Sequence, residues 1–134
     1  SFIKNNKINN VDLLGPKWGS ELDPLIQGCK FTIVPSEWYD PSPYVVLQSF
    51  AHGKPVLASN IGGLQDLIVD NKNGQLFEPK NHKQLSDKIK KLFSDNDKII
   101  QLGIFARKIL EKKNNSERYY SETMNVFKKL IENK

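Results

Sequence analysis

Residues 31–59, FTIVPSEWYDPSPYVVLQSFAHGKPVLAS, decide the fold of this chain. The stretch opens with a short apolar run at residues 31–34, rich in β-branched side chains and typical of a strand buried in a parallel sheet. Pro43 suits the first position of a following helix because it lacks an N–H, and Gly53 suits its C-terminal cap. A second apolar run follows at residues 56–59. The order predicts one βαβ unit whose polar loop and helix N-terminus lie at the carboxyl edge of the sheet, where open α/β folds bind ligands.

Composition and charge are those of a globular chain of one domain. The net charge is +5 over 134 residues, and the lysines lie mostly in the last third, mixed with acids. This pattern favours a solvated helical face over a patch for nucleic acid or lipid. Cys29 is the single cysteine, so no internal disulfide can form and a reducing compartment is expected. No Cys/His cluster has zinc-like spacing, and no apolar run is long enough to cross a bilayer.

The remaining segments add strands before and helices after the central unit. Residues 11–14 predict a strand, and a short helix is expected to end at Gly28. That helix is capped either by Ser20 or by Asp23, with Pro24 in the first helical position in the second case. Residues 75–78 predict a last short strand, and helical periodicity begins at about residue 82. We therefore expect an α/β fold in which helices flank a parallel sheet. The three expected apolar helical stripes are Leu85, Ile89, Leu92 and Phe93; Ile99, Leu102, Phe105, Ala106 and Ile109; and Tyr120, Met124, Phe127 and Ile131.

The loop at residues 37–43 is the best candidate for a binding site. It ends at a helix N-terminus, where unpaired N–H groups and the helix dipole favour an anion. Backbone donors are expected from Ser42, Tyr44 and Val45. Asp40 lies on the same loop, and Gln48 lies about one helical turn inside the helix. A carboxylate and an amide side chain for hydroxyl groups, with backbone amides for phosphate, suit a sugar nucleotide; the alternative is a capped helix with a polar edge.

A glycine pair follows the second strand of the central unit. Gly62 and Gly63 would let the backbone approach a phosphate closely, although two glycines also form ordinary turns. No Ser-His-Asp, Cys-His or Walker pattern is present.

Six stretches in this order resemble the C-terminal, donor-binding domain of the GT-B fold glycosyltransferases of group 1, glycosyltransferase family 4. Residues 40–56, DPSPYVVLQSFAHGKPV, resemble the family helix E-G-F-G-L-V-V-L-E-A-M-A-x-G-K-P-V. The other similar stretches are residues 11–15 (V-x-x-L-G), 31–36 (F-V-x-P-S), 62–66 (G-G-x-P-E), 73–74 (N-G) and 102–107 (L-G-x-x-A-R). The likeness runs almost from end to end of the chain and implies a Rossmann-like fold.

The resemblance implies roles for individual residues. The two glutamates of the family helix fall on Asp40 and Gln48, of which the first would contact the transferred sugar and the second the ribose hydroxyls. The rest of the nucleotide-sugar site would comprise Ser42, Pro43, Tyr44, Val45, Gly62 and Gly63. The donor would be a nucleoside-diphosphate sugar, transferred with retention of configuration, without a metal, a cofactor or a nucleic-acid partner.

The resemblance also implies that the domain is incomplete. The family's domain opens with a strand, a glycine-containing loop and a helix, and with an Arg/Lys pair that reaches the diphosphate; nothing here matches them. We therefore expect residues 1–134 to be a single incomplete donor-binding domain that lacks its first two strands and the N-terminal acceptor-binding domain, and is inactive alone. In the strand order 3-2-1-4-5-6, the missing strands separate residues 11–14 from residues 31–34. Three outcomes are open: residues 11–14 move in beside residues 31–34, a second copy of the chain fills the gap, or the strand stays detached on the surface. We expect the first, in which residues 11–14 pair directly with residues 31–34.

Two functions remain open at this point. The first is the donor-binding part of a bacterial, cytoplasmic hexosyltransferase in polysaccharide or glycolipid biosynthesis, whose full-length form would associate peripherally with the inner face of the membrane. The second is a degenerate, non-catalytic module that binds a sugar nucleotide or another protein.

Overall fold

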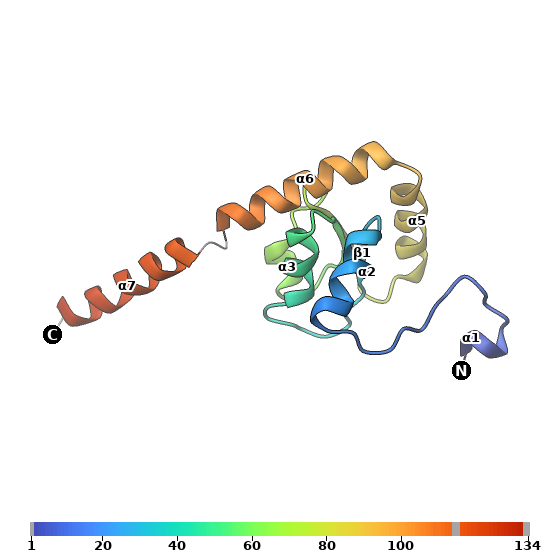
Figure 1. Ribbon diagram of the computed structural model, residues 1–134, viewed down its shortest axis with the longest axis horizontal. Helices are drawn as coiled ribbons and strands as arrows, with labels where there is room; N and C mark the ends of the chain where they lie inside the picture. Colours follow the sequence, from blue (N-terminus) through green and yellow to red (C-terminus); the bar gives the residue numbers. More distant parts are fainter. Residues whose placement is uncertain (1, 114–115, 133–134) are drawn as a thin grey trace.

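The computed structural model describes residues 2–113 and 116–132. Its centre is a sheet of three parallel strands in the order β1 (Thr32–Val34), β2 (Val56–Ser59) and β3 (Gly74–Phe77). Helices surround this sheet (Figure 1). The predicted α/β fold with a parallel sheet and flanking helices is confirmed.

The helices form the connections and a long C-terminal arm. They are α1 (Phe2–Asn5), α2 (Leu22–Gly28), α3 (Tyr44–Ala51), α4 (Leu64–Leu67), α5 (His82–Phe93), α6 (Asn96–Lys113) and α7 (Ser116–Glu132), and a 3-10 turn, η1 (Gly19–Glu21), precedes α2. In Figure 1, α6 lies along one side of the core, α7 projects away from it, and the N-terminal segment leaves at the opposite end. The three-stranded core is therefore bounded by two extensions.

The βαβ unit around α3 holds the core together. Val46 and Phe50 of α3 are fully buried and pack in one cluster with Val56 and Ala58 of β2 and with Ala106 of α6. In an α-helix, positions four apart lie on one face, so a single stripe of α3 meets the sheet. Burying such side chains contributes roughly 1.5–3 kcal/mol each.

The C-terminus of α3 ends as predicted, with glycine in the left-handed conformation. Gly53 has φ +65°, and its N–H donates to the carbonyl of Phe50 at 3.0 Å. The next N–H, of Lys54, donates to the carbonyl of Ser49 at 2.9 Å. This pair of bonds is a Schellman motif, which satisfies carbonyls that the helix itself leaves free.

The predicted strand at residues 11–14 does not form, and the prediction that it pairs with residues 31–34 is wrong. The ladder of β1 runs only to β2, and Val11, Leu13 and Leu14 remain exposed. A parallel strand requires cover on both of its faces. Because Ile33 of β1 is itself 40% exposed, the sheet beside β1 lacks the cover that would stabilise a further apolar strand.

Two predicted helix starts also differ by a few residues. Helix α2 begins at Leu22 after the turn η1, so Pro24 is its third residue, and neither Ser20 nor Asp23 caps it. The Asp23 carboxylate pairs with His52 instead. Pro43 takes the N-cap of α3 with an extended backbone, φ −69° and ψ 96°, rather than the first helical position. Both helices end where the sequence predicts.

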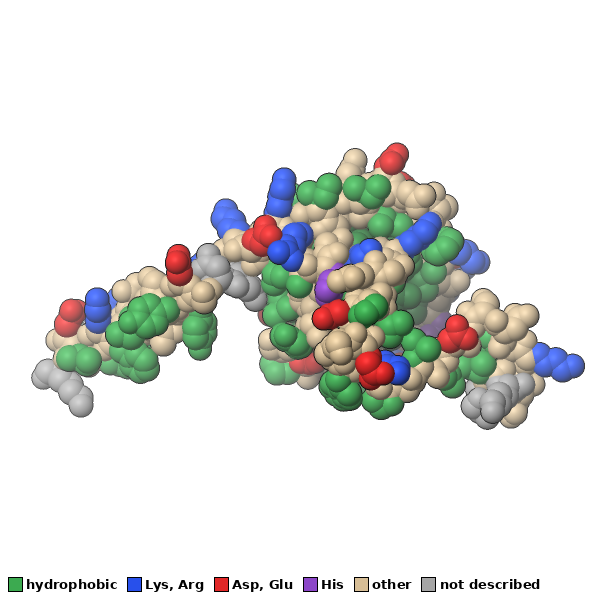
Figure 2. All heavy atoms as spheres, viewed as in Figure 1, with side chains coloured by type: hydrophobic (Ala, Val, Ile, Leu, Met, Phe, Trp, Pro, Cys, Tyr) green, Lys and Arg blue, Asp and Glu red, His purple; other side chains and the backbone are tan. Residues whose placement is uncertain are grey.

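The helical stripes of the C-terminal arm differ in what they contact. In α6, Leu102 and Ala106 are buried against the core. Phe93, predicted in the stripe of α5, is 58% exposed and lies under the ammonium group of Lys30, 4.3 Å from the ring centroid. The large apolar side chains of α7 are exposed, and Figure 2 shows them gathered along one side of that helix; they are Tyr119, Tyr120, Val126, Phe127, Leu130 and Ile131.

Candidate functional site

The loop between β1 and α3 bends back on itself at Asp40. The carboxylate of Asp40 accepts a hydrogen bond from the backbone N–H of Ser42 at 3.0 Å, which fixes the last turn of the loop before α3. The amide of Ser42, predicted to face an anion, is thus already engaged by a carboxylate. Its hydroxyl side chain is exposed.

The N-terminus of α3 keeps two backbone donors free. Pro43 has no N–H, and the N–H of Val46 donates to the Pro43 carbonyl at 3.0 Å. Within the described residues, the amides of Tyr44 and Val45 have no acceptor and no side chain caps them. These two amides, at the positive end of the helix dipole, are the groups available to an anion.

The glycine pair lies against the Asp40 loop. Gly63 donates its N–H to the carbonyl oxygen of Asp40 at 2.9 Å, although the two residues are far apart in sequence. Gly62 has φ +56°, and a Cβ built there would lie 3.2 Å from the backbone of Asp40. A Cβ on Gly63 would lie 2.8 Å from the Asp40 carbonyl oxygen. The two segments predicted to share one site are therefore in direct backbone contact, and only glycine allows that approach.

Gln48 lies one turn along α3 from Tyr44, and positions four apart share one face of a helix. Gln48 is half-buried, whereas Tyr44 is 69% exposed. The predicted residues Asp40, Ser42, Pro43, Tyr44, Val45, Gly62 and Gly63 thus surround the N-terminus of α3, with Gln48 one turn further in.

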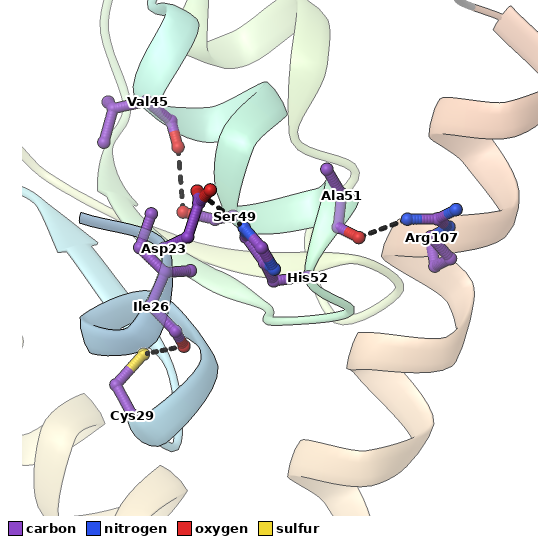
Figure 3. Close-up of polar contacts among 8 residues, drawn as sticks. All are labelled: Asp23, Ile26, Cys29, Val45, Ser49, Ala51, His52 and Arg107. Atoms are coloured by element: carbon purple, nitrogen blue, oxygen red, sulfur yellow. Dashed lines mark hydrogen bonds and ion pairs between the residues drawn. The ribbon is translucent and has the colours of Figure 1, made fainter. Parts of the chain in front are cut away.

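A hydroxyl pair that the sequence did not reveal anchors α3 to the sheet. The Ser49 hydroxyl donates to the carbonyl of Val45 at 2.8 Å, as Figure 3 shows, and it accepts a hydrogen bond from the Thr32 hydroxyl at 2.8 Å. A serine inside a helix, whose hydroxyl can donate to the carbonyl four residues earlier, is the one local signal for the bond to Val45. This link ties the C-terminal half of α3 to the first residue of β1.

The opposite end of α3 is tied to two other helices (Figure 3). Nε2 of His52 lies 3.1 Å from Oδ1 of Asp23 on α2. The guanidinium of Arg107 on α6 donates to the carbonyl of Ala51, and its Nε lies 2.6 Å from a carboxylate oxygen of Glu111. These contacts fix α3 between α2 and α6.

Cys29 lies near this end, where α2 meets β1. Its thiol donates to the carbonyl of Ile26 at 3.1 Å. Partial burial raises the pKa of the Cys29 thiol above its ordinary value, and the nearby positive charge of Lys54 opposes that rise. Hollows of about 530 and 640 Å³ lie along α6, and the predicted site residues line neither of them.

Residues 2–113 and 116–132 contain neither a metal-binding cluster of side chains nor a membrane-spanning helix. In that part of the chain, no group of three or more His, Cys, Asp or Glu side chains is arranged to hold a metal ion. None of its helices combines the length and the apolar character needed to cross a membrane.

Comparison with known proteins identifies the family. The sequence profile described as "Glycosyl transferases group 1" matches residues 2–109. The chain belongs to the group 1 glycosyltransferases. An uncharacterized glycosyltransferase of Methanocaldococcus jannaschii is 32% identical over 103 residues, which make up 77% of this chain and 29% of that protein. The poly(ribitol-phosphate) alpha-N-acetylglucosaminyltransferase of Staphylococcus aureus is 29% identical over 96 residues, or 71% of this chain and 20% of that protein.

Solved structures of glycosyltransferases share the fold of this group 1 chain. Anabaena HepE, whose crystal structure is in complex with UDP, superposes with a TM-score of 0.82 at 23% identity. The match covers 92% of this chain and 35% of HepE. This chain spans only about a fifth to a third of the length of the proteins it matches.

Proposed function

We propose that this chain is the C-terminal, donor-binding part of a family 4 glycosyltransferase. In this proposal it binds a nucleoside-diphosphate sugar and supports transfer of a hexose with retention of configuration. Membership of group 1 supports glycosyl transfer, and the relatives that it matches are named glycosyltransferases. The UDP bound in the HepE structure supports a nucleotide-sugar donor.

The observation that carries the proposal is the hydrogen bond from Gly63 to Asp40 beside the free amides of Tyr44 and Val45. In the proposed complex, these amides and the helix dipole bind the diphosphate. Their strength toward a charged oxygen is about 1.5–3 kcal/mol per hydrogen bond. As the sugar leaves, negative charge develops on the diphosphate, so the same donors stabilise the transition state.

The side chains nearby are assigned to the hydroxyl groups of the donor. Asp40 contacts the transferred sugar, and Gln48 contacts the ribose from the same side of α3. Ser42, Pro43, Gly62 and Gly63 complete the wall of the site. The donor is a substrate in this scheme, and neither a resident cofactor nor a metal is required.

The partners of the whole enzyme are also part of the proposal. An acceptor-binding domain outside this segment would supply the acceptor, a polysaccharide or a glycolipid, in the cytoplasm of a bacterium and with peripheral contact to the inner membrane face. Turnover requires that domain, so we expect donor binding but no transfer from residues 1–134 alone.

The test is a titration of the isotope-labelled chain with UDP-glucose and GDP-mannose, followed by backbone amide shifts. We expect shifts at residues 42–48 and at Gly62 and Gly63, with affinity in the millimolar range, near −4 kcal/mol. Uridine without phosphate is the matched control, and it should leave the amides of Tyr44 and Val45 unchanged. Shifts confined to α5, α6 and α7 would overturn the assignment.

One observation favours a second candidate, a binding module without catalysis. Gln48 carries no charge, and the Asp40 carboxylate is already shared with the Ser42 amide. Transfer assays on the full-length gene product separate the candidates, because the module binds the donor without consuming it.

A further inference from the structure

A groove lies along α6, at the end of α3 remote from the proposed donor site. Its volume is about 640 Å³, within the 300–1,000 Å³ of ordinary small-molecule sites. It is lined by Cys29, Lys30, Gly53, Lys54, Ile99, Ile100, Gly103, Ile104, Arg107, Lys108 and Glu111. The walls come from α6, from the end of α2 and from the turn after α3.

The floor of the groove is a close contact between two backbones. A Cβ built on Gly103 would overlap the carbonyl oxygen of Gly53 and lie 3.6 Å from Pro55. Helix α6 therefore rests directly on the turn after α3 at a point without side chains. The larger side chains of α6 on either side of Gly103 form the walls of the hollow.

One part of the groove is apolar and open to solvent. Ile100 and Ile104 lie one turn apart on α6 and are 58% and 53% exposed. Other residues of α6, Leu102 and Ala106 among them, are the ones buried against the core. The two isoleucines are therefore not needed to pack the helix onto the core. They form a short apolar strip inside the hollow that an alkyl group can contact.

The rim beside the isoleucines is basic. Four cations and one carboxylate line the groove, and that carboxylate, of Glu111, is paired with Arg107. Lys30 donates to Asn96 at 2.8 Å. The ammonium groups of Lys54 and Lys108 make no ion pair and no side-chain hydrogen bond within the described residues. Two ammonium groups without an ion-pair partner among the described residues thus line the groove together with the apolar side chains of Ile100 and Ile104.

We propose that this groove binds a fatty-acid anion. Its alkyl chain lies along Ile100 and Ile104, and its carboxylate lies between Lys54 and Lys108. From Ile100 to Lys108 the helix rises by about 12 Å, so the apolar wall and the ammonium group of Lys108 follow each other along α6, and Lys54 lines the groove from the turn after α3. Charge complementarity selects an anion, and the adjacent exposed isoleucines select one that carries an alkyl chain.

Cys29, the single cysteine of the chain, reports on occupancy from the groove wall. The test measures the rate at which N-ethylmaleimide, an uncharged reagent, alkylates Cys29 with and without decanoate. We expect decanoate to slow the reaction at least threefold, decanol to slow it less than decanoate, and acetate to leave it unchanged. Equal protection by decanol and decanoate, or no protection by decanoate, would overturn the proposal.

Two variants and one control locate the bound molecule. Ile104→Glu places an acid on the alkyl path at an exposed position and should abolish protection, while Lys108→Gln should weaken decanoate binding about fivefold. Lys112→Gln removes an exposed charge from the same helix outside the groove and should leave binding unchanged. Each variant is compared with its own rate without ligand, and the amides of α6 are followed in parallel. If Lys108→Gln and Lys112→Gln behave alike, or if an apolar helical peptide protects better than decanoate, the proposal fails.

The groove and the proposed donor site are tested independently. UDP-glucose should not change the alkylation rate of Cys29, because the donor site lies at the other end of α3. Failure of donor binding would leave the decanoate result intact, and the reverse also holds.

Discussion

The two ends of helix α3 are built differently. At the C-terminus, the carbonyls of Ser49, Phe50 and Ala51 all accept hydrogen bonds, from the following turn and from Arg107. At the N-terminus, the amides of Tyr44 and Val45 have no partner within the described residues. Every helix leaves its first N–H groups without an intrahelical partner, and here no side chain caps these two, so the N-terminal end of α3 leaves donors open to an anion.

On this basis, we expect the C-terminal end of α3 to contribute mainly to the stability of the fold, and the N-terminal end mainly to donor binding. The C-terminal half carries the fully buried Phe50 and the contacts to α2 and α6. The N-terminal half carries the exposed Tyr44 and the contact to the glycine pair. If this division is correct, substitutions at the two ends should separate unfolding free energy from donor affinity.

The largest effect is expected from Phe50→Ala. The side chain is 1% exposed, and truncating a buried phenylalanine costs about 3–5 kcal/mol. Urea unfolding followed by circular dichroism measures the loss. Tyr44→Ala on the same helix, where the side chain is 69% exposed, is the control and should change stability by no more than about 0.5 kcal/mol. Similar losses for both would show that the N-terminal half also carries the fold.

Gly63→Ala should disturb the Asp40 loop and, with it, the N-terminal end of α3. The added Cβ would lie 2.8 Å from the Asp40 carbonyl oxygen, so the loop must move away from α4. We expect a loss of about 1–3 kcal/mol in unfolding free energy and loss of the donor-induced shifts at Tyr44 and Val45. Gly28→Ala is the control, since a Cβ there meets nothing within 4 Å. Donor shifts that survive in Gly63→Ala would separate the glycine pair from the binding site.

Gly53→Ala tests the C-terminal end of α3, where the carbonyls are hydrogen-bonded, without a steric clash. The residue has φ +65°, and the nearest atom to an added Cβ is 3.9 Å away, so the cost is conformational rather than steric. A left-handed conformation costs an alanine about 1–2 kcal/mol, which urea unfolding would measure. Donor affinity should stay unchanged, because the N-terminus of α3 is untouched. A weakened affinity would mean that the two ends of the helix are coupled.

Local sequence rules located much of this arrangement. Apolar runs bounded by Pro35 and Gly53 predicted β1, α3 and β2, because the signals for strand ends and helix caps lie within a few residues. The proximity of Gly63 to the Asp40 loop followed from placing both at the carboxyl edge of one parallel sheet. These inferences needed only chain order and the handedness of the unit.

The errors arose where the outcome depends on distant partners. An apolar run at residues 11–14 looks like a strand, but whether it joins a sheet depends on a neighbour and on cover from other elements. The bonds from Arg107 to Ala51 and from Thr32 to Ser49 join segments that no local pattern connects. Periodicity also predicts an apolar stripe on α7, but it cannot predict whether another element covers that stripe, and in the structure the stripe is exposed.

The smallest effect is expected from Gln48→Glu, which tests donor binding at the N-terminal end of α3. A carboxylate accepts a stronger hydrogen bond from the ribose hydroxyls than a neutral amide does. The difference is about 1 kcal/mol, so donor affinity should rise roughly fivefold while unfolding free energy stays nearly the same. Amide-shift titration with UDP-glucose measures both the affinity and the position of binding.

Gln27→Glu, on the exposed surface of α2, adds the same charge away from the site and should leave affinity unchanged. The added carboxylate also lies within the same site as the diphosphate, and repulsion between the two would lower affinity. An unchanged or weaker donor affinity in Gln48→Glu would therefore show that repulsion outweighs the stronger bond, and that the neutral glutamine avoids this repulsion.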